Sequence, residues 1–420
     1  LSNARRRHVA VLADLPGPKL RVPLNGPREL AAGASVTIGL RAGADAELNL
    51  TEPEALRRLK AGQRVLMDDG RLQATVASVG KDVAVLTMTV GGTLLPNKGV
   101  NLPDTDLDIP SVTERDKAAI EVALDAGADW FALSFVRDAK AARELRAAMT
   151  RDDIPILAKI ERPEAVTKSA EIIDAFDGIM VARGDLGVEI PLEKVPHVQK
   201  ALIQQARGAG KPVITATDML DSMRANARPT RAEVSDVANA VYDGTDAVML
   251  SGETAVGAYP FEAFSCMSRV LEEAEAHQNY DAPRHIVVPR AKMLDHVTHA
   301  ICQLAQEVGA DAIVAPTLSG KTMRHIARHR PRQAIIAVAT ETAVARQLGV
   351  VWGINCVLEA HNDESGHNRL EAAVRAAFRA GCVKAGALLI VTSRHPIIGG
   401  PGCPTIRVVR VGDAGQCWEP

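Results

Sequence analysis

The chain has 420 residues and a net charge of −2, with 47% hydrophobic and 3% aromatic residues. This length and apolar content predict two or three domains with sizeable cores. The balanced charge and the scarcity of aromatic side chains argue against a nucleic-acid-binding surface.

The six cysteines are scattered along the chain without paired spacing. This distribution is typical of reduced thiols in a cytoplasmic protein and not of a disulfide framework or a zinc site. No apolar run approaches the roughly 18 residues of a membrane-spanning helix, so we expect a cytoplasmic protein without membrane association.

In chain order, the first apolar run is "HVAVLAD" at residues 8–14, which predicts a strand. Residues 23–96 follow with short β-type runs, such as "ASVTIGL" and "VAVLTMTV", separated by turn signals. We interpret this segment as a small β domain that is inserted after the first strand. The chain then returns at "LPNKGVNLP" (95–103).

From residue 111 onward, short apolar runs alternate with amphipathic helical patterns. The runs are "WFALSFV" (130–136), "PILAKIE" (155–161), "GIMVARGD" (178–185), "PVITAT" (212–217) and "DAVMLSGE" (246–253). Continuous apolar strands that alternate with helices predict a parallel sheet covered on both faces, and their spacing fits the βα units of a barrel. From residue 285, runs such as "DAIVAPT" and "AIIAVAT" alternate with helices again and predict an open α/β domain.

Each predicted barrel strand ends in small or polar residues. These are Ser134, Lys159 and Glu161, Gly184 and Asp185, Thr217, and Ser251 and Glu253. The carboxyl ends of parallel barrel strands meet at one rim, where active sites are built. A single Lys-x-Glu pair would more often be a surface ion pair, but polar ends on five strands in register predict a site.

Several segments resemble the signature motifs of the pyruvate kinase family and occur in that family's order. They are "LADLPGPKLR" (12–21), "LPNKGVNLP" (95–103), "AKIE" (158–161), "GIMVARGDLGVEIPLEKV" (178–195) and "ARPTRAEVSDVANAVYDGTDAVMLSGETAVGAYP" (227–260). The resemblance spans essentially the whole chain. It implies a TIM-type (β/α) barrel over 1–22 and 97–284, a small β-barrel lid over 23–96 and a C-terminal α/β regulatory domain over 285–420.

The resemblance implies transfer of a phosphoryl group from phosphoenolpyruvate to ADP, which gives pyruvate and ATP. Glu161 and Asp185 would be the ligands of Mg²⁺ or Mn²⁺, which prefer carboxylate oxygens. Lys159 would neutralise the phosphoryl group in flight. Thr217 would help deliver a proton to carbon, and Ser134 and Gly184 would bind substrate. The backbone N–H groups at the start of the "RGDLG" helix can hold an anion such as the substrate carboxylate.

Further residues follow from the same resemblance. Ser251 and Glu253 would support this polar network from behind. Arg21 would hold the transferred phosphate, because a guanidinium can bind phosphate oxygens bidentately. Asp69 matches the lid aspartate near the closed site, although an aspartate in an ordinary β-turn is an equal alternative.

Asp14 matches a monovalent-cation ligand of the potassium-dependent members. Lys19 stands where many relatives have glutamate, and its ammonium could supply the charge of K⁺. We therefore expect that K⁺ is not required. Leu15 replaces the family's usual threonine, which agrees with this.

In the C-terminal domain, the resemblance implies a sugar-phosphate effector pocket and a homotetramer. The pocket would use Ser319, Lys321 and Thr322, with "GGPG" (399–402) and its Gly400 and Gly402 as the facing loop. A plain helix start at "LSGKT" (318–322) is the alternative.

The chain departs from the family at two points. The first two βα units of the barrel are absent, so we expect a fragment of a longer protein. Asp218 stands where relatives usually have glutamine, beside Thr217. Two other functions remain open: a metal-enolate barrel enzyme, such as an oxoacid decarboxylase or lyase, and a non-catalytic metabolite-binding relative.

Overall fold

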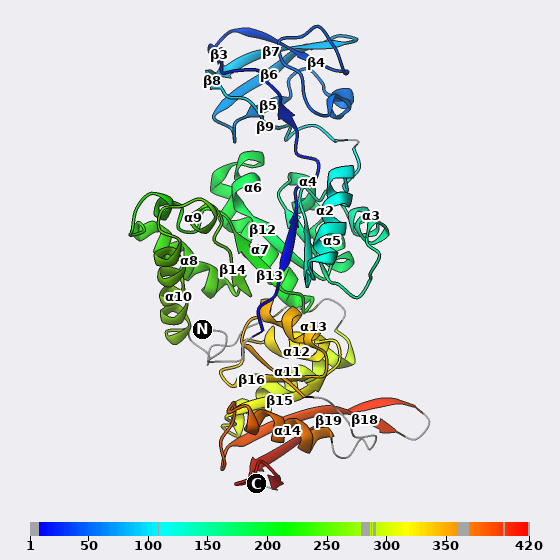
Figure 1. The fold of residues 1–420 in the computed structure, drawn as a ribbon, viewed down its shortest axis with the longest axis vertical. Helices are drawn as coiled ribbons and strands as arrows, with labels where there is room; N and C mark the ends of the chain where they lie inside the picture. The colour runs from blue at the N-terminus through cyan, green and yellow to red at the C-terminus, as the bar shows by residue number, and fades with distance from the viewer. Residues whose placement is uncertain are drawn as a thin grey trace.

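The computed structural model describes residues 8–107, 109–278, 286, 288, 291–359, 369–397 and 400–418. Three parts follow one another along the long axis of the molecule (Figure 1). The β-rich lid lies at one end, the parallel sheet with its helices lies in the middle, and the C-terminal α/β part lies at the other end. Among the described residues, no helix is long and apolar enough to cross a membrane.

The central sheet consists of parallel strands in chain order, as expected for successive βα units. Its strands are β1 (Leu12–Leu15), β10 (Trp130–Leu133), β11 (Ile156–Ile160), β12 (Gly178–Ala182), β13 (Val213–Ala216) and β14 (Ala247–Val248). Of the described strands, β1 and β14 are the edges, so the sheet is an open half-barrel of TIM-like form. Strands β10, β12 and β13 are buried along their whole length, which is typical of parallel strands covered on both faces.

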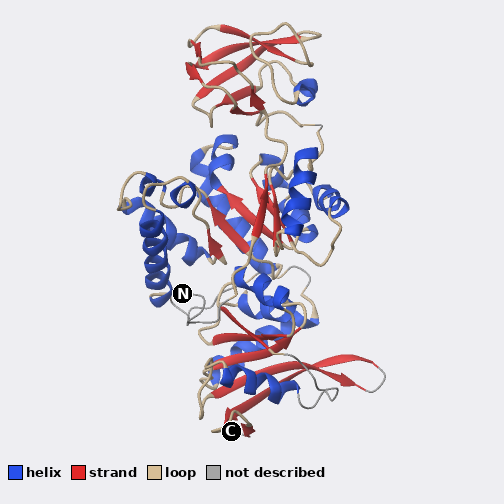
Figure 2. Cartoon of the chain, viewed as in Figure 1, coloured by secondary structure: helices blue, strands red, loops and turns tan. Residues whose placement is uncertain are grey.

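Helices cover this sheet, as Figure 2 shows. They are α2 (Glu114–Asp125), α3 (Lys140–Ala148), α4 (Pro163–Thr167), α5 (Ser169–Ala175), α6 (Arg183–Glu189), α7 (Val195–Gly208), α8 (Arg231–Asp243), α9 (Gly252–Ala255) and α10 (Pro260–Ala276). Helix α8 begins with a capping box between Thr230 and Glu233, and it ends at Gly244 in the left-handed conformation. Local sequence therefore determines both ends of this helix.

The lid is an antiparallel half-barrel with its own apolar core. Its main sheet has the order β2 (Arg21–Val22), β9 (Lys98–Asn101), β5 (Arg64–Met67), β6 (Leu72–Val79), β7 (Val83–Val90) and β4 (Ser35–Gly39), and β3 (Arg28–Leu30) pairs with β8 (Gly92–Leu94). The lid begins and ends on neighbouring strands, because Val22 of β2 is the register partner of Lys98 of β9.

The C-terminal part is a mixed α/β sheet. Its order is β17 (Ile354–Leu358), β16 (Ala334–Ala339), β15 (Ala312–Thr317), β18 (Leu388–Ile397), β19 (Gly400–Val411) and β20 (Cys417–Trp418), and β19 and β20 are antiparallel. Its helices are α11 (Met293–Glu307), α12 (Lys321–Ala327), α13 (Thr342–Gln347) and α14 (Arg369–Arg379).

The C-terminal part contacts the amino ends of the barrel strands. Arg330 forms an ion pair of 3.1 Å with Asp246, which precedes β14. The indole of Trp130, the first residue of β10, donates to the carbonyl of Gln347 at 3.1 Å. The carboxyl ends of the strands, where the sequence places its polar residues, therefore lie at the opposite rim.

Candidate active site

Lys159 is the centre of a polar cluster at the carboxyl end of β11. Its Nζ donates to Ser134 Oγ at 2.8 Å and to Asp14 Oδ1 at 3.1 Å. It also lies 3.2 Å from Glu161 Oε1. The Lys159 side chain is only 13% exposed, so these contacts hold the ammonium in one place. The structure thus brings together four predicted residues from three neighbouring strands and the loops that follow them.

Glu161 is a fully buried carboxylate. Its Oε2 accepts a hydrogen bond of 2.6 Å from the backbone N–H of Phe135. Its Oε1 faces Lys159 but lacks a hydrogen bond of good geometry within the described residues. Burial raises the pKa of Glu161 to about 7, the charge of Lys159 opposes this rise, and the charge of Asp185 adds to it.

Asp185 lies in the first turn of α6 and forms an ion pair of 3.0 Å with Lys19. The Lys19 ammonium also lies 5.7 Å from the centre of the Phe135 ring. Lys19 and Asp14, which we expected at one monovalent-cation position, therefore have different partners: Lys19 pairs with Asp185, and Asp14 pairs with Lys159. A lysine side chain is long enough to reach past its nearest neighbours, so sequence spacing does not fix its partner.

Glu161 and Asp185 fit a hard divalent cation. Within the part of the chain that the structure describes, one buried Glu161 oxygen has no hydrogen bond, and the negative charge of Asp185 raises the pKa of Glu161. No group of three or more histidine, cysteine or acidic side chains within the described ranges could hold a metal ion. A site with two carboxylates matches Mg²⁺, which usually keeps waters and substrate phosphate oxygens as its remaining ligands.

Thr217 lies directly after β13 in a strained conformation, with φ of +67°. Its Oγ accepts a hydrogen bond of 2.6 Å from the N–H of Gly184 and donates one of 2.6 Å to the carbonyl of Ala216. Arg183 donates to the Thr217 carbonyl at 2.7 Å and so supports this conformation. The N–H of Gly184, which we expected to hold an anion, is therefore already used by Thr217.

Glu253 is buried and connects the loop after β13 to the loop after β14. Its carboxylate accepts from the N–H of Leu220 at 3.0 Å and from the N–H of Ser251 at 2.8 Å. Ser251 and Glu253 are thus hydrogen-bonded to each other, and Glu253 also holds Leu220 in the loop that begins at Thr217. Burial raises the pKa of Asp218, and the charges of Asp221 and Glu253 add to this rise.

Arg21 and Asp69 lie on the lid side. Arg21, on β2, donates to the carbonyl of Asn97 at 2.8 Å. Asp69 is exposed in the turn between β5 and β6, with φ of +54°. A methyl group added to the next residue, Gly70, would lie 3.5 Å from Val188 of α6, so this turn approaches the helix that carries Asp185.

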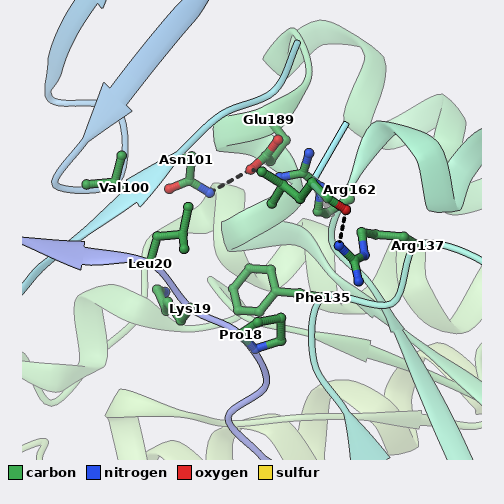
Figure 3. Close-up of a pocket in the computed structure, with 10 residues that line it drawn as sticks. Pro18, Lys19, Leu20, Val100, Asn101, Phe135, Arg137, Arg162 and Glu189 are labelled. Carbon is green, nitrogen blue, oxygen red and sulfur yellow. Dashed lines mark hydrogen bonds and ion pairs between the residues drawn. The ribbon is translucent and has the colours of Figure 1, made fainter. Parts of the chain in front are cut away.

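A buried network between the lid and the rim, shown in Figure 3, was not predicted from the sequence. Asn101 at the end of β9 donates to Glu189 of α6 at 2.8 Å, and Arg162 lies 3.4 Å from the same carboxylate oxygen. All three side chains are buried. A charged residue directly after Glu161 was the only sequence signal for this network.

The predicted effector residues lie at the carboxyl end of β15. Ser319 and Lys321 are exposed, and Gly320 between them has φ of +72°. Gly400 and Gly402 belong to strand β19 and not to a loop, because the chain after residue 399 pairs with β18. Gly399 itself lies outside the described residues.

Two family models match the chain. The model described as "Pyruvate kinase, barrel domain" matches residues 2–264, and the model described as "Pyruvate kinase, alpha/beta domain" matches residues 295–409.

Individual proteins agree with these models. A pyruvate kinase of Geobacillus stearothermophilus is 43% identical over 405 residues, which cover 93% of this chain and 68% of that protein. A pyruvate kinase of Mycobacterium tuberculosis H37Rv is 44% identical over 358 residues, which cover 84% of this chain and 75% of that protein. The crystal structure of a pyruvate kinase from Cryptosporidium parvum matches 97% of this chain and 86% of that one, with a TM-score of 0.85 and 33% identity.

Proposed function

The chain belongs to the pyruvate kinase family, and from this premise we propose which of its residues carry out the family's reaction. The activity is transfer of a phosphoryl group from phosphoenolpyruvate to ADP, which yields pyruvate and ATP. Both the barrel and the C-terminal α/β region match models of this family, which disfavours the alternative of another metal-enolate enzyme.

Glu161 and Asp185 would hold the divalent cation, Mg²⁺ or Mn²⁺. When bound, this cation would neutralise charge on the phosphate and on the enolate oxygen. The observation that carries the proposal is the buried Glu161 oxygen, which has no hydrogen bond within the described residues and lies 3.2 Å from the Lys159 ammonium. The charge of Asp185 also raises the pKa of Glu161.

Lys159 acts on the phosphoryl group. Its ammonium is held by Ser134 and Asp14 and cannot turn freely into solvent. A fixed positive charge at a partly buried position stabilises the negative charge of the transferred group without reorganisation. Arg21 would hold the phosphate from the lid side, and Asp69 would approach when the lid closes. Ser134 would contact the substrate directly, and Gly184 would act through Thr217, whose hydroxyl accepts the Gly184 N–H.

Thr217 carries the hydroxyl that would help deliver a proton to the substrate carbon. Its hydroxyl is fixed between the Gly184 N–H and the Ala216 carbonyl. Ser251 and Glu253 would keep this loop in place, and the extra carboxyl of Asp218 would add negative charge nearby. Lys19 would supply the charge of a monovalent cation, so that K⁺ is not required.

The remaining assignments are supported by resemblance alone. They are the homotetramer and the sugar-phosphate effector at Ser319, Lys321, Thr322, Gly400 and Gly402. The cytoplasm as the compartment is supported by five free cysteines within the described part of the chain.

A direct assay tests the proposal. Pyruvate formation from phosphoenolpyruvate and ADP is followed with Mg²⁺ and with a chelator, for the parent chain and for Glu161→Gln. We expect activity that depends on the cation in the parent and is lost in the variant. A variant as active as the parent would contradict the assignment of Glu161.

A further inference from the structure

Two segments join the lid to the barrel, and both contact the helix that carries Asp185. The first segment, residues 16–20, places Lys19 on Asp185 in the first turn of α6. The second segment, residues 101–107, places Asn101 on Glu189 at the end of the same helix. Helix α6 is therefore held at both ends by the lid connections.

Glu189 is the residue of α6 that Asn101 of the second connection contacts. It is 1% exposed, and its Oε1 accepts from Asn101 Nδ2 at 2.8 Å and pairs with Arg162 at 3.4 Å. Its Oε2 has no hydrogen-bond partner in the described part of the chain. A buried ion pair adds little net stability. The buried charge of Glu189 is therefore better explained by a role in positioning α6 than by stabilisation of the fold.

Arg162 links the same network to the other candidate cation ligand. It follows Glu161 directly in the chain and is 2% exposed. Its Nη2 donates to the backbone carbonyls of Leu102 and Thr105, each at 3.2 Å. The backbone of the second connection is therefore hydrogen-bonded to Arg162, the residue that follows Glu161 in the chain.

We propose that Glu189 is a positioning residue which, with Arg162 and Asn101, couples the second lid connection to the divalent-cation site. Asp185 and Glu189 are four residues apart and lie on one face of α6. A displacement of Asn101 is therefore transmitted to Asp185 through the helix and to Glu161 through Arg162. This inference rests on the proposed cation site. Because energetic coupling is reciprocal, the cation should also order the lid connection.

The first measurement is Mn²⁺ affinity of the full chain without substrate, by electron paramagnetic resonance. Glu189→Gln keeps the shape of the side chain and removes its charge. We expect Mn²⁺ binding to weaken about 5–10-fold, within the usual range of coupling between sites. Asn101→Ser breaks the same contact from the lid side and should act in the same direction. The double variant should bind Mn²⁺ no more weakly than Glu189→Gln alone, because both changes weaken the same contact between Asn101 and Glu189.

The matched control is Asp246→Asn. Asp246 is also a buried carboxylate paired with an arginine, Arg330, but it lies at the amino ends of the strands. This variant should lose thermal stability and keep the Mn²⁺ affinity of the parent. A purely structural role of Glu189 would make the two variants alike.

The second measurement is amide hydrogen exchange of residues 100–107 with and without Mn²⁺. The cation should slow exchange in the parent and in Asp246→Asn, and it should have no such effect in Glu189→Gln. Unchanged Mn²⁺ affinity in both Glu189→Gln and Asn101→Ser would overturn the coupling. If Glu161→Gln also bound Mn²⁺ like the parent, the cation site itself would be wrong, so the two failures are distinguishable.

Discussion

The ammonium of Lys19 lies 3.0 Å from a carboxylate oxygen of Asp185, with the side chains 27% and 24% exposed. The positive charge that the sequence suggested in place of K⁺ thus lies directly beside a candidate ligand of the divalent cation. It comes from the segment that leads into the lid.

The first prediction concerns this lysine. Activity of the parent should be nearly the same in K⁺ and in tetramethylammonium at constant ionic strength. Lys19→Glu should create a need for K⁺, so that K⁺ raises the rate about tenfold. The reason is that Asp185 and the introduced carboxylate would leave negative charge unbalanced in a poorly screened site. Lys98→Glu, which breaks a lysine–aspartate pair within the lid, is the control. Strong activation of the parent by K⁺ would contradict the prediction.

The second prediction concerns the two carboxylates. Glu161→Gln and Asp185→Asn should each weaken Mn²⁺ binding at least about 100-fold, since loss of a mere supporting contact already costs about 10–100-fold. Calorimetric titration with Mn²⁺ in the presence of phosphoenolpyruvate measures this effect. Circular dichroism should show an unchanged fold. Binding like that of the parent in both variants would exclude these residues as ligands.

The third prediction separates binding from turnover. Lys159→Met should leave Mn²⁺ and phosphoenolpyruvate binding close to that of the parent and lower kcat by several orders of magnitude. The reason is that the charge of Lys159 acts mainly on the transition state. Ser134→Ala, which removes only one partner of Lys159, should lower kcat much less. A Lys159→Met enzyme within tenfold of the parent would exclude this role, by the same comparison of rates.

The fourth prediction is a pH dependence of cation binding. In the metal-free protein, burial raises the pKa of Glu161 to about 7 from an ordinary value of 4.5. Below about pH 7 a proton therefore competes with the cation, and Mn²⁺ affinity should rise about tenfold per pH unit up to pH 7 and then level off.

Without metal, the same shift should lower the free energy of unfolding as pH rises from 4.5 to 7. The folded protein binds more protons than the unfolded chain in this range, so its advantage is lost as the buried carboxyl ionises. Mn²⁺ titrations and urea unfolding at pH 5.5, 6.5 and 7.5 test both statements. Glu161→Gln should remove both dependences.

The fifth prediction concerns acid stability. Burial lowers the pKa of His329 to about 3, and the charge of Arg328 adds to this shift. Below pH 6.5 the unfolded chain binds a proton that the folded protein does not, so stability should fall by about 1.4 kcal/mol per pH unit. Urea midpoints at pH 7.5 and 5.5 should differ less in His329→Gln than in the parent. The exposed His277→Gln should behave like the parent.

The strands that carry the site, and the rim at which its residues lie, could largely be predicted from the sequence. Alternation of apolar runs with helical patterns identified the five strands from β10 to β14, and strand direction placed Ser134, Lys159 and Glu161 at one rim. These predictions depend on local periodicity, which short sequence segments contain.

The partners of long charged side chains could not be predicted in this way. The sequence placed Lys19 with Asp14, whereas the structure pairs it with Asp185, which follows β12, the fourth of the six strands in the sheet. The network of Asn101, Arg162 and Glu189 joins three elements distant in sequence, and each residue alone would be taken for a surface side chain. Such contacts depend on how the lid meets the barrel, which no local pattern specifies.

The pairing of β2 with β9 makes the lid a removable module. Val22 and Lys98 face each other across neighbouring antiparallel strands, although the rest of the lid lies between them in the chain. A two-residue Asn-Gly turn can join such strands. Excision of residues 23–97 with such a turn would leave the path of the barrel chain unchanged. In evolutionary terms, a barrel of this kind could gain, lose or exchange its cover in one recombination event, because none of the described strands of the sheet beneath pairs with a lid strand.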